Sequence, residues 1–439
     1  MNGTERIGMF GAGYVGLVSG ACLAEVGHTV VCVDRDARKI EALRRGEIPI
    51  YEPGLEDIVR RNAEAGRLAF TTDAAEAAAS CDLLFVAVGT PSLDNGDVDM
   101  SQVTSALRHI AAAAETDKIV VMKSTVPVGT GTKAEALLRS LARSGVRFDV
   151  VSNPEFLREG TAVHDTFHMD RIVIGAASEA AGERVKAALA PFGAPTLTTD
   201  RESAELIKYA SNSFLATKIS FINEMANVCE KVGADIEAVA RGMGMDRRIG
   251  PSFLNAGLGY GGFCLPKDTR AQLFIAEDVD YDFKIMRAVI EVNQLQRQRF
   301  VRKVRAAFGG DLHGRTLAVM GLSFKPNTDD LRDAPSLDVI GMLSQYGAGI
   351  RGYDPISRDK AAPLLPHAFL TDDPYEALRG ADAMLVVTEW EQIRSLDLDR
   401  AKRELRHPYV FDGRNVFDAE EMRAKGFAYY PIGKAPTIP

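Results

Sequence analysis

Residues 6–16 decide the fold of this chain, and they read RIGMFGAGYVG. The first five residues are an apolar run of the length of a buried strand. Gly11-Ala12-Gly13-Tyr14-Val15-Gly16 follows directly, has the spacing GxGxxG, and opens a helix-like run. Glycines at these points permit a tight turn and bring the backbone close to a pyrophosphate at the helix N-terminus. The stretch therefore predicts a strand–turn–helix unit that binds a dinucleotide.

The second expected strand, residues 29–33, supports the same interpretation because it ends at Asp34. An acid at this point accepts hydrogen bonds from the ribose hydroxyls of NAD and repels the 2′-phosphate of NADP. Arg35 follows and weakens that discrimination. Turn, strand and acid in register favour NAD as the cofactor over the alternative, a glycine-rich turn beside an ordinary strand-end aspartate.

The rest of the chain has three regions. Strand-like and helix-like runs alternate up to about residue 200 and again from Arg315, which is typical of parallel sheets with crossover helices. Residues 202–231 lack proline and glycine, and their apolar residues recur at steps of three and four, which predicts a long, mostly buried helix. A second long helix is expected at 284–308. The sequence thus predicts an α/β fold, with Rossmann-like doubly wound domains at 1–200 and 309–439 joined by a central helical domain at 201–308.

The two alternating regions are expected to bind different ligands. The first turn of the second region, residues 321–324, reads GLSF and lacks the full glycine fingerprint. The N-terminal region is therefore the one expected to bind the dinucleotide.

Composition excludes several functions. The 439 residues are 46% hydrophobic and 26% charged, with a net charge of −8, which suits a multidomain globular protein and argues against a nucleic-acid binder. We expect no signal peptide, because no basic stretch followed by an apolar one precedes the first strand. No apolar run reaches the ~20 residues of a membrane helix. The five cysteines form no CxxC pair or zinc motif. We therefore expect no metal, and we expect Cys22, Cys32 and Cys81 to be reduced core residues of a cytoplasmic protein.

Residues 259–268, which read GYGGFCLPKD, carry the strongest chemical signal. Three glycines before Cys264 would let a ligand approach the backbone. Pro266 suits a first helical turn, which places Cys264 at a helix N-terminus where the dipole favours a thiolate. Asp268 lies four residues further on and is expected to face the same pocket. The alternative for a lone cysteine is a small buried core residue.

Lys208 and Asn212 are also four residues apart, within the expected long helix. An ammonium and an amide on one face can stabilise an alkoxide or a tetrahedral intermediate. A polar stripe on the protein surface is the alternative.

Further polar residues follow strand ends. Asn153-Pro154 predicts an N-cap with proline in the first turn, which would place Glu155 and Glu159 one turn apart. These acids either complement the helix dipole or supply a general base for water. The hydroxyl residues of GTP (89–91) and STVPVG (124–129) are expected to line the cofactor crevice, or to be turn residues only.

Taken in order, these motifs resemble the UDP-glucose 6-dehydrogenase family. The matching segments are GAGYVG, GTP, STVPVGT, NPEFLREG, KYASNSFLATKISFINE, RIGPSFLNAGLGYGGFCLPKD, GLSFKPNTDDLRDAP and DGRNV, which together span nearly the whole chain. The resemblance implies a homodimer that oxidises UDP-glucose to UDP-glucuronate, reducing two NAD per turnover through a thiohemiacetal and a thioester on a cysteine.

The resemblance also implies residue roles. Cys264 would be the nucleophile, and Lys208 and Asn212 would hold the C6 oxygen. Glu155 would assist the hydrolytic water, while Thr125 and Asp268 would position a water for proton transfer. The implied NAD contacts are Gly11, Gly13, Tyr14, Val15, Gly16, Asp34, Lys39, Thr90, Thr125, Glu159 and Arg332. The implied UDP-glucose contacts are Glu155, Phe156, Leu157, Lys208, Asn212, Phe253, Leu254, Asn255, Gly257, Tyr260, Gly261, Lys325 and Arg414, with Arg248 reaching across from the second subunit.

One residue departs from the family pattern, and the proposed activity has three competitors among known functions. Phe263 stands beside Cys264 where a serine is more usual in the family. The nearest competing function is the same chemistry on GDP-mannose or a UDP-N-acetylhexosamine, and FLNAGLGYGG favours the UDP-glucose branch. A two-electron β-hydroxyacid dehydrogenase has no use for a nucleophilic cysteine. A non-catalytic NAD sensor would have no need of Cys264, Lys208, Asn212 and Asp268.

Overall fold

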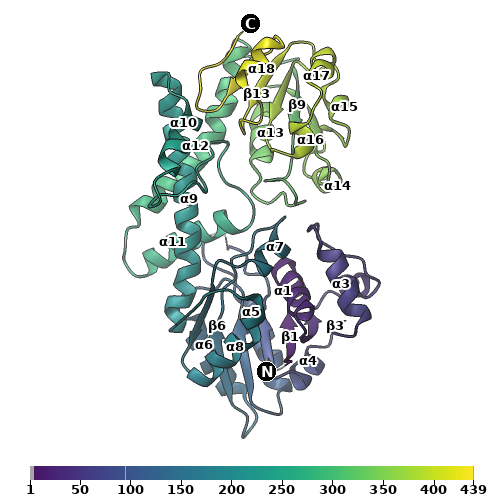
Figure 1. The fold of residues 1–439 in the computed structure, drawn as a ribbon, viewed down its shortest axis with the longest axis vertical. Helices are drawn as coiled ribbons and strands as arrows, with labels where there is room; N and C mark the ends of the chain where they lie inside the picture. The colour runs from purple at the N-terminus through teal and green to yellow at the C-terminus, as the bar shows by residue number, and fades with distance from the viewer. Residues whose placement is uncertain (1–3, 94, 439) are drawn as a thin grey trace. The chain divides into compact units, whose positions relative to one another are not determined.

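A computed structural model of the chain describes residues 4–93 and 95–438. The chain divides into two compact units, and the boundary falls after Ser211, inside the long helix α9 (Arg201–Val232). Each unit contains one β-sheet with its own helices (Figure 1).

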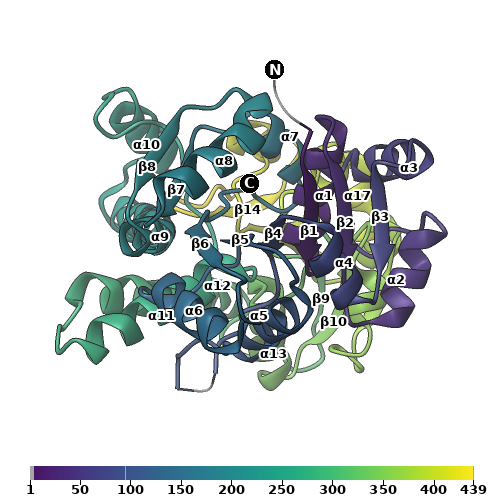
Figure 2. The same cartoon turned by 90° about the horizontal axis from the view of Figure 1, so that it is seen from below.

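The first unit is built on an eight-stranded sheet. The strand order is β3-β2-β1-β4-β5-β6-β7-β8, which can be followed through the labels of Figure 2. Every neighbouring pair is parallel except β6 and β7. The first six strands have doubly wound order, so the topological switch point lies between β1 and β4. The strands are β1 (Arg6–Phe10), β2 (Thr29–Val33), β3 (Leu68–Thr71), β4 (Leu83–Val86), β5 (Lys118–Met122), β6 (Phe148–Ser152), β7 (Ile172–Ala176) and β8 (Thr196–Thr199).

Helices cover both faces of this sheet, because alternate residues of its central strands are apolar on both sides. Leu83 and Phe85 of β4 pack into one buried cluster with α1 and α8, whereas Leu84 and Val86 pack into another with α5 and α6. The helices are α1 (Tyr14–Glu25), α2 (Ala37–Arg44), α3 (Leu55–Glu64), α4 (Ala74–Ser80), α5 (Ser101–Ala113), α6 (Thr130–Leu141), α7 (Ala162–Phe167) and α8 (Glu179–Leu189).

The second unit has a six-stranded parallel sheet in the order β11-β10-β9-β12-β13-β14, again a doubly wound order. The two sheets and the helices between them confirm the predicted fold class. The strands are β9 (Thr316–Met320), β10 (Gly349–Tyr353), β11 (Phe369–Thr371), β12 (Ala383–Val386), β13 (Tyr409–Asp412) and β14 (Ala428–Pro431). The helices are α10 (Ile236–Gly244), α11 (Cys264–Asp278), α12 (Lys284–Ala307), α13 (Pro335–Gln345), α14 (Arg358–Ala361), α15 (Pro374–Leu378), α16 (Glu391–Arg394), α17 (Leu398–Glu404) and α18 (Ala419–Ala424).

The long helix is confirmed in extent but not in burial. Expected at 202–231, α9 spans Arg201–Val232. The prediction that residues 202–231 are mostly buried is wrong for four large apolar residues: Leu206 is 42% exposed, Phe214 66%, Phe221 49% and Val228 48%. The periodicity marked an apolar face, but a single chain covers only part of that face.

The described residues contain neither a membrane-spanning helix nor a cluster of metal-binding side chains. Within residues 4–93 and 95–438, none of the helices combines the length and apolarity needed to span a bilayer, and no cluster of His, Cys, Asp and Glu could hold a metal ion. Cys22, Cys32, Cys81 and Cys229 are buried free thiols, whereas Cys264 is partly exposed. The predicted core positions of the first three are confirmed.

Candidate active site

The glycine-rich turn between β1 and α1 has three glycines in three different environments. Gly11 has φ +105°, and a Cβ atom there would lie 2.5 Å from the carbonyl oxygen of Ala87. A Cβ atom at Gly16 would lie 1.9 Å from the carbonyl oxygen of Gly11. At Gly13 a Cβ atom would meet nothing within 4 Å. Two glycines thus serve the packing of the turn, and the open one leaves room for a pyrophosphate at the helix N-terminus, so the turn fits NAD.

Asp34, directly after β2, is held beside this turn. Its carboxylate accepts hydrogen bonds from the backbone N–H of Ala12 at 3.0 Å and of Asp36 at 3.0 Å, and pairs with Lys39 Nζ at 2.7 Å. Burial alone would raise the pKa of Asp34, but the hydrogen bonds and the Lys39 charge lower it below its ordinary value. The structure therefore brings together three features expected at the cofactor: the glycine-rich turn, Asp34 and Lys39.

Tyr14 connects the turn to the loop at residues 153–160. Its hydroxyl donates to the buried carboxylate of Glu52 and accepts from the backbone N–H of Gly160 at 2.7 Å. Glu52 also accepts from Gly160 N–H at 2.7 Å. Burial, reinforced by the Glu52 carboxylate, raises the pKa of Tyr14 far above its ordinary value, so the phenol stays protonated and can donate.

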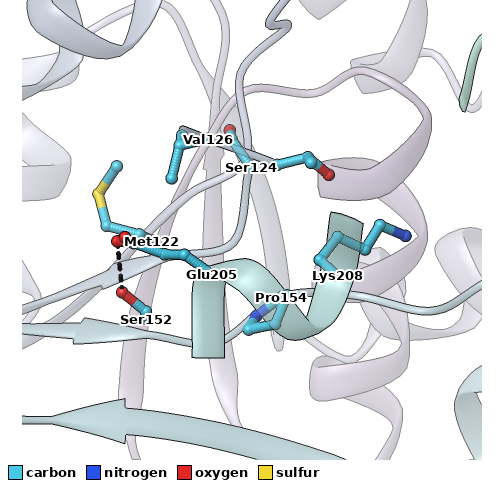
Figure 3. Close-up of a pocket in the computed structure, with 8 residues that line it drawn as sticks. Met122, Ser124, Val126, Ser152, Pro154, Glu205 and Lys208 are labelled. Carbon is cyan, nitrogen blue, oxygen red and sulfur yellow. Dashed lines mark hydrogen bonds between the residues drawn. The ribbon is translucent and has the colours of Figure 1, made fainter. Parts of the chain in front are cut away.

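The loops after β4 and β5 meet at the carboxyl end of the sheet, as expected for crevice loops. Thr90 Oγ donates to the carbonyl oxygen of Thr125 at 2.9 Å, and Ser124 Oγ donates to that of Val88 at 2.7 Å. A small pocket opens here (Figure 3). It is lined by Met122, Ser124, Thr125, Val126, Ser152, Pro154, Glu205 and Lys208.

Glu205 fixes one wall of this pocket and was not predicted. Its buried carboxylate accepts hydrogen bonds from Gly129 N–H at 2.6 Å, Gly131 N–H at 2.8 Å and Ser152 Oγ at 3.0 Å; the last is dashed in Figure 3. Burial raises the pKa of Glu205. The residue joins α9 to the loop that carries Thr125. A glutamate in a helix gives no local sign of such burial, so the sequence offered no signal.

Lys208 and Glu155 form a buried ion pair. Lys208 Nζ lies 3.0 Å from Glu155 Oε1, and the two residues are 3% and 6% exposed. Glu155 Oε2 also accepts from Leu157 N–H at 2.8 Å. Asn212, one turn further along α9, is 8% exposed. The alternative of a polar surface stripe at Lys208 and Asn212 is therefore excluded.

The predicted helix start at Asn153 is wrong. No helix begins there, and residues 153–160 form a loop before α7. The Asn153 side chain is bound elsewhere: its Oδ1 accepts from Lys123 Nζ at 3.1 Å and its Nδ2 donates to the carbonyl oxygen of Val173 at 2.8 Å. Tertiary hydrogen bonds thus replace the capping bond, and Glu155 is positioned by the ion pair rather than by a helix turn.

In the second unit, Cys264 is the first residue of α11, as predicted. The thiol lies in the helical turn where unpaired N–H groups and the dipole favour a thiolate. Asp268, one turn on, is 1% exposed and accepts from Asn212 Nδ2 at 2.6 Å. Its other oxygen contacts the ammonium of Lys267, a buried residue that was not predicted.

The glycines before Cys264 pack closely against other parts of the chain. A Cβ atom would lie 2.3 Å from Asn293 Oδ1 at Gly259, 2.4 Å from the Asp333 carbonyl oxygen at Gly261, and 2.7 Å from the Phe324 ring at Gly262. Other parts of the chain therefore approach the backbone closely at all three glycines, where a side chain would clash.

Phe263, the departure from the family pattern, packs beside charged groups. Arg332, an expected NAD contact, has its guanidinium carbon 4.2 Å from the centre of the Phe263 ring. Lys267 Nζ lies 5.6 Å from the same ring. The aromatic ring therefore offers these cations a contact that a serine could not.

Several residues expected at the UDP-sugar meet around the loop at 253–257. Phe253 has φ +63°, rare for a non-glycine residue and frequent at ligand sites. A Cβ atom at Gly257 would lie 3.3 Å from Arg414 Nη1, and Arg414 donates to the Val387 carbonyl oxygen at 2.7 Å. Tyr260 is buried, which raises its pKa. Leu254 is buried, Asn255 is exposed, and Lys325 lies over the Phe324 ring.

Asp354 shows why the second unit does not repeat the dinucleotide site. It follows β10 as Asp34 follows β2, but it is fully buried. Its carboxylate accepts from Leu322 N–H at 2.8 Å, Ser323 N–H at 3.0 Å and Trp390 Nε1 at 3.2 Å. These internal donors leave it unable to meet a ribose, in agreement with the missing glycine fingerprint.

The turn with its acid, together with the cysteine at a helix N-terminus, is typical of an NAD-dependent oxidoreductase. Models of the UDP-glucose/GDP-mannose dehydrogenase family match along the chain: the NAD binding domain at residues 5–193, the central domain at 202–295 and the UDP binding domain at 318–419. The chain belongs to this family.

Individual relatives agree. The chain is 48% identical to the UDP-glucose 6-dehydrogenase TuaD of Bacillus subtilis, over 98% of this chain and 93% of that protein. It is 48% identical to the UDP-glucose 6-dehydrogenase of Rhizobium meliloti, over 98% and 99%. Among solved structures, a UDP-glucose dehydrogenase from Pyrobaculum islandicum superposes with a TM-score of 0.93 at 38% identity, covering 99% of each chain. A UDP-D-ManNAc dehydrogenase from Pyrococcus horikoshii gives 0.86 at 25%, covering 98% and 99%.

Replacing Asp34 by alanine is expected to raise KM for NAD about tenfold or more, since a hydrogen bond to a charged group contributes ~1.5–3 kcal/mol. The preference for NAD over NADP should fall as well, because the repulsion of a 2′-phosphate is lost. Steady-state kinetics with both cofactors measure this. Asp36→Ala is the matched control: Asp36 caps α2 by accepting from the N–H groups of Arg38 and Lys39, so its loss should cost ~1 kcal/mol of stability without changing the cofactor preference. Equal cofactor preference in both variants would contradict the assignment.

Proposed function

We propose that this protein is an NAD-dependent dehydrogenase that oxidises the C6 alcohol of UDP-glucose to the carboxylate of UDP-glucuronate. The observation that carries the proposal is the 47–48% identity to several UDP-glucose 6-dehydrogenases over nearly the whole chain. We assign NAD binding to residues 1–200, the central helical domain to 201–308 and UDP-sugar binding to 309–439. Four electrons leave the substrate, so each turnover consumes one water and two NAD and yields two NADH and three protons.

The proposed mechanism divides this oxidation into covalent steps. NAD supplies the hydride acceptor for both oxidations. The first oxidation gives an aldehyde, to which Cys264 adds as a thiolate, and a proton completes the thiohemiacetal. The second gives a thioester, and water then releases the acid and returns the thiol. Lys208 and Asn212 are suited to hold the C6 oxygen, because both are buried and a charge or amide donor acts more strongly where water is excluded.

The remaining polar groups are assigned to the hydrolysis and to the proton transfers. Glu155, held by Lys208 and by Leu157 N–H, is assigned to assist the hydrolytic water. Asp268, held by Asn212, and Thr125, which lines the pocket, are assigned to position a water. The remaining cofactor and substrate contacts are proposed as the family resemblance implies them.

A screen of sugar nucleotides tests the substrate. UDP-glucose, GDP-mannose, UDP-N-acetylglucosamine and UDP-N-acetylmannosamine would be compared by kcat/KM for NADH formation. We expect UDP-glucose to give the highest value. A higher kcat/KM with another sugar nucleotide would overturn the substrate assignment while leaving the chemistry intact.

We also propose that the protein works as a homodimer in the cytoplasm. Phe214, Phe221 and Val228 are 66%, 49% and 48% exposed and recur every seven residues along α9, so they share one uncovered apolar face. Arg248 is exposed and pairs only locally with Asp246 among the contacts described, which suits the proposed reach to a second subunit. Free buried thiols suit a reducing compartment, and cell fractionation tests the location.

Replacing Phe221 by glutamate is expected to convert the dimer to a monomer, because a charge at the centre of an apolar interface is left without a partner. Light scattering after gel filtration measures the mass. Leu364→Glu is the matched control: Leu364 is 55% exposed but lies outside α9, so this variant should remain dimeric. A Phe221→Glu variant with the wild-type mass would contradict the interface, as would a wild-type protein that is monomeric at micromolar concentration.

A further inference from the structure

Lys123 is a buried lysine for which the mechanism above has no role. It directly follows β5 and is 8% exposed. Its neighbours Met122 and Ser124 both line the pocket. The Lys123 side chain itself reaches the loop at residues 153–160. There its ammonium donates to Asn153 Oδ1 at 3.1 Å.

Asn153 transmits this contact to the loop that carries Glu155. Its backbone N–H donates to the Met122 carbonyl oxygen at 2.9 Å, and its Nδ2 donates to the Val173 carbonyl oxygen at 2.8 Å. The side-chain oxygen thus has Lys123 as its donor, while the rest of the residue is tied to β5 and β7. Lys123 thus completes the set of bonds that fixes Asn153, two positions before Glu155.

Lys123 also belongs to a group of three buried charges. Glu155 and Lys208 form the ion pair at 3.0 Å, and both act electrostatically on Lys123. Burial lowers the pKa of Lys123 to about 8; the Glu155 carboxylate opposes this shift and the Lys208 ammonium adds to it. Below about pH 8 Lys123 adds a positive charge beside the Glu155–Lys208 ion pair, and above about pH 8 that charge is lost.

We propose that Lys123 is a positioning residue for the Glu155–Lys208 pair: it holds Asn153 at the start of the loop and places a second buried positive charge beside the pair. The proposal rests on the proposed function, since the pair serves the oxidation there. The charge attracts the Glu155 carboxylate and helps to hold it in place. It also raises the positive potential that a developing alkoxide meets at Lys208. Loss of the Lys123 proton removes both effects.

Kinetic profiles of three variants test this role. In the wild type, kcat should fall through a limb near pH 8 that reports Lys123. Lys123→Met should lack this limb and remain about tenfold slower at pH 7, a smaller loss than the ~10²–10³ of a direct oxyanion donor. Lys123→Arg keeps a charge that does not titrate, so it should restore the rate at pH 7 and also lack the limb. Lys118→Met is the matched control, because Lys118 is a buried lysine at the opposite end of β5, bonded to the Ala79 carbonyl oxygen; it should keep the limb.

A stability titration tests the same charge without any turnover. The folded protein holds the Lys123 proton less tightly than the unfolded chain, in which the pKa is near 10.5. The unfolded state therefore binds more protons between about pH 8 and 10.5, and the wild type should gain stability relative to Lys123→Met as pH rises through that window. Thermal unfolding midpoints across this range measure the gain.

The outcomes separate the two proposals. Failure to oxidise UDP-glucose would remove the proposed function, yet the stability titration would still report whether Lys123 is the buried titrating charge. A Lys123→Met variant that keeps the wild-type limb, or that shows no relative change in melting temperature between pH 8 and 10.5, would overturn the role of Lys123. If Lys123→Arg does not fold, the comparison of Lys123→Met with Lys118→Met decides.

Discussion

Replacing Cys264 by serine is expected to stop the formation of UDP-glucuronate, with a loss of at least about 10³-fold in kcat. A thiolate at the first residue of a 15-residue helix is stabilised by the dipole, whereas a serine hydroxyl stays protonated there and is a poor nucleophile. Chromatography of the nucleotide sugars at fixed times measures the product. Binding of NAD, followed by fluorescence quenching, should be unchanged because Cys264 lies outside the glycine-rich turn.

Cys229→Ser is the control for this prediction. Cys229 lies in the same unit but is a core residue, 2% exposed, so a hydroxyl there should lower the melting temperature and leave the product unchanged. A Cys264→Ser variant that forms UDP-glucuronate at the wild-type rate would remove the covalent mechanism.

Replacing Lys208 by methionine is expected to lower kcat about 10²–10³-fold, the usual loss when one donor to a developing oxyanion is removed. The same change takes the ion-pair partner from Glu155, which is 6% exposed, so the protein should also lose ~3–5 kcal/mol of stability. Stopped-flow measurement of NADH formation and denaturant unfolding report the two effects separately.

A double variant distinguishes catalysis from stability at this pair. Lys208→Met with Glu155→Gln removes both charges of the pair, so it should recover part of the lost stability, because residue 155 no longer carries an unpaired charge; the buried Lys123 ammonium keeps its hydrogen bond to Asn153. The rate should not recover, because the donor is still missing and the carboxylate assigned to the hydrolytic water is gone as well. Recovery of both would mean that Lys208 serves only to pair with Glu155.

Most of the fold could be predicted because apolar periodicity and glycine placement are local signals. The glycine-rich turn, the strands that flank it and the extents of α9 and α12 follow from residue spacing alone. Strand β8 reads TLTT and is partly exposed, so it lacks the apolar run that predicts a strand. The antiparallel pairing of β6 with β7 depends on tertiary contacts that no local pattern encodes.

The candidate site divides in the same way. The position of Cys264 at a helix start could be predicted because Pro266 is typical of a first helical turn. Lys123, Glu205 and Lys267 could not, since lysine and glutamate are ordinarily exposed and their burial depends on distant partners. Asn153 shows the converse. It is a residue type that often caps a helix, but here its side chain bonds Lys123 and the Val173 carbonyl oxygen instead. The exposed face of α9 likewise reflects a surface that one chain does not cover.

The stoichiometry of the reaction tests the central claim most directly. Purified protein, a known limiting amount of UDP-glucose and excess NAD would be allowed to react to completion, and the absorbance of NADH would be compared with the UDP-glucose consumed. The account predicts two NADH for each UDP-glucose, with UDP-glucuronate as the product. One NADH for each UDP-glucose, with an aldehyde released, would contradict it.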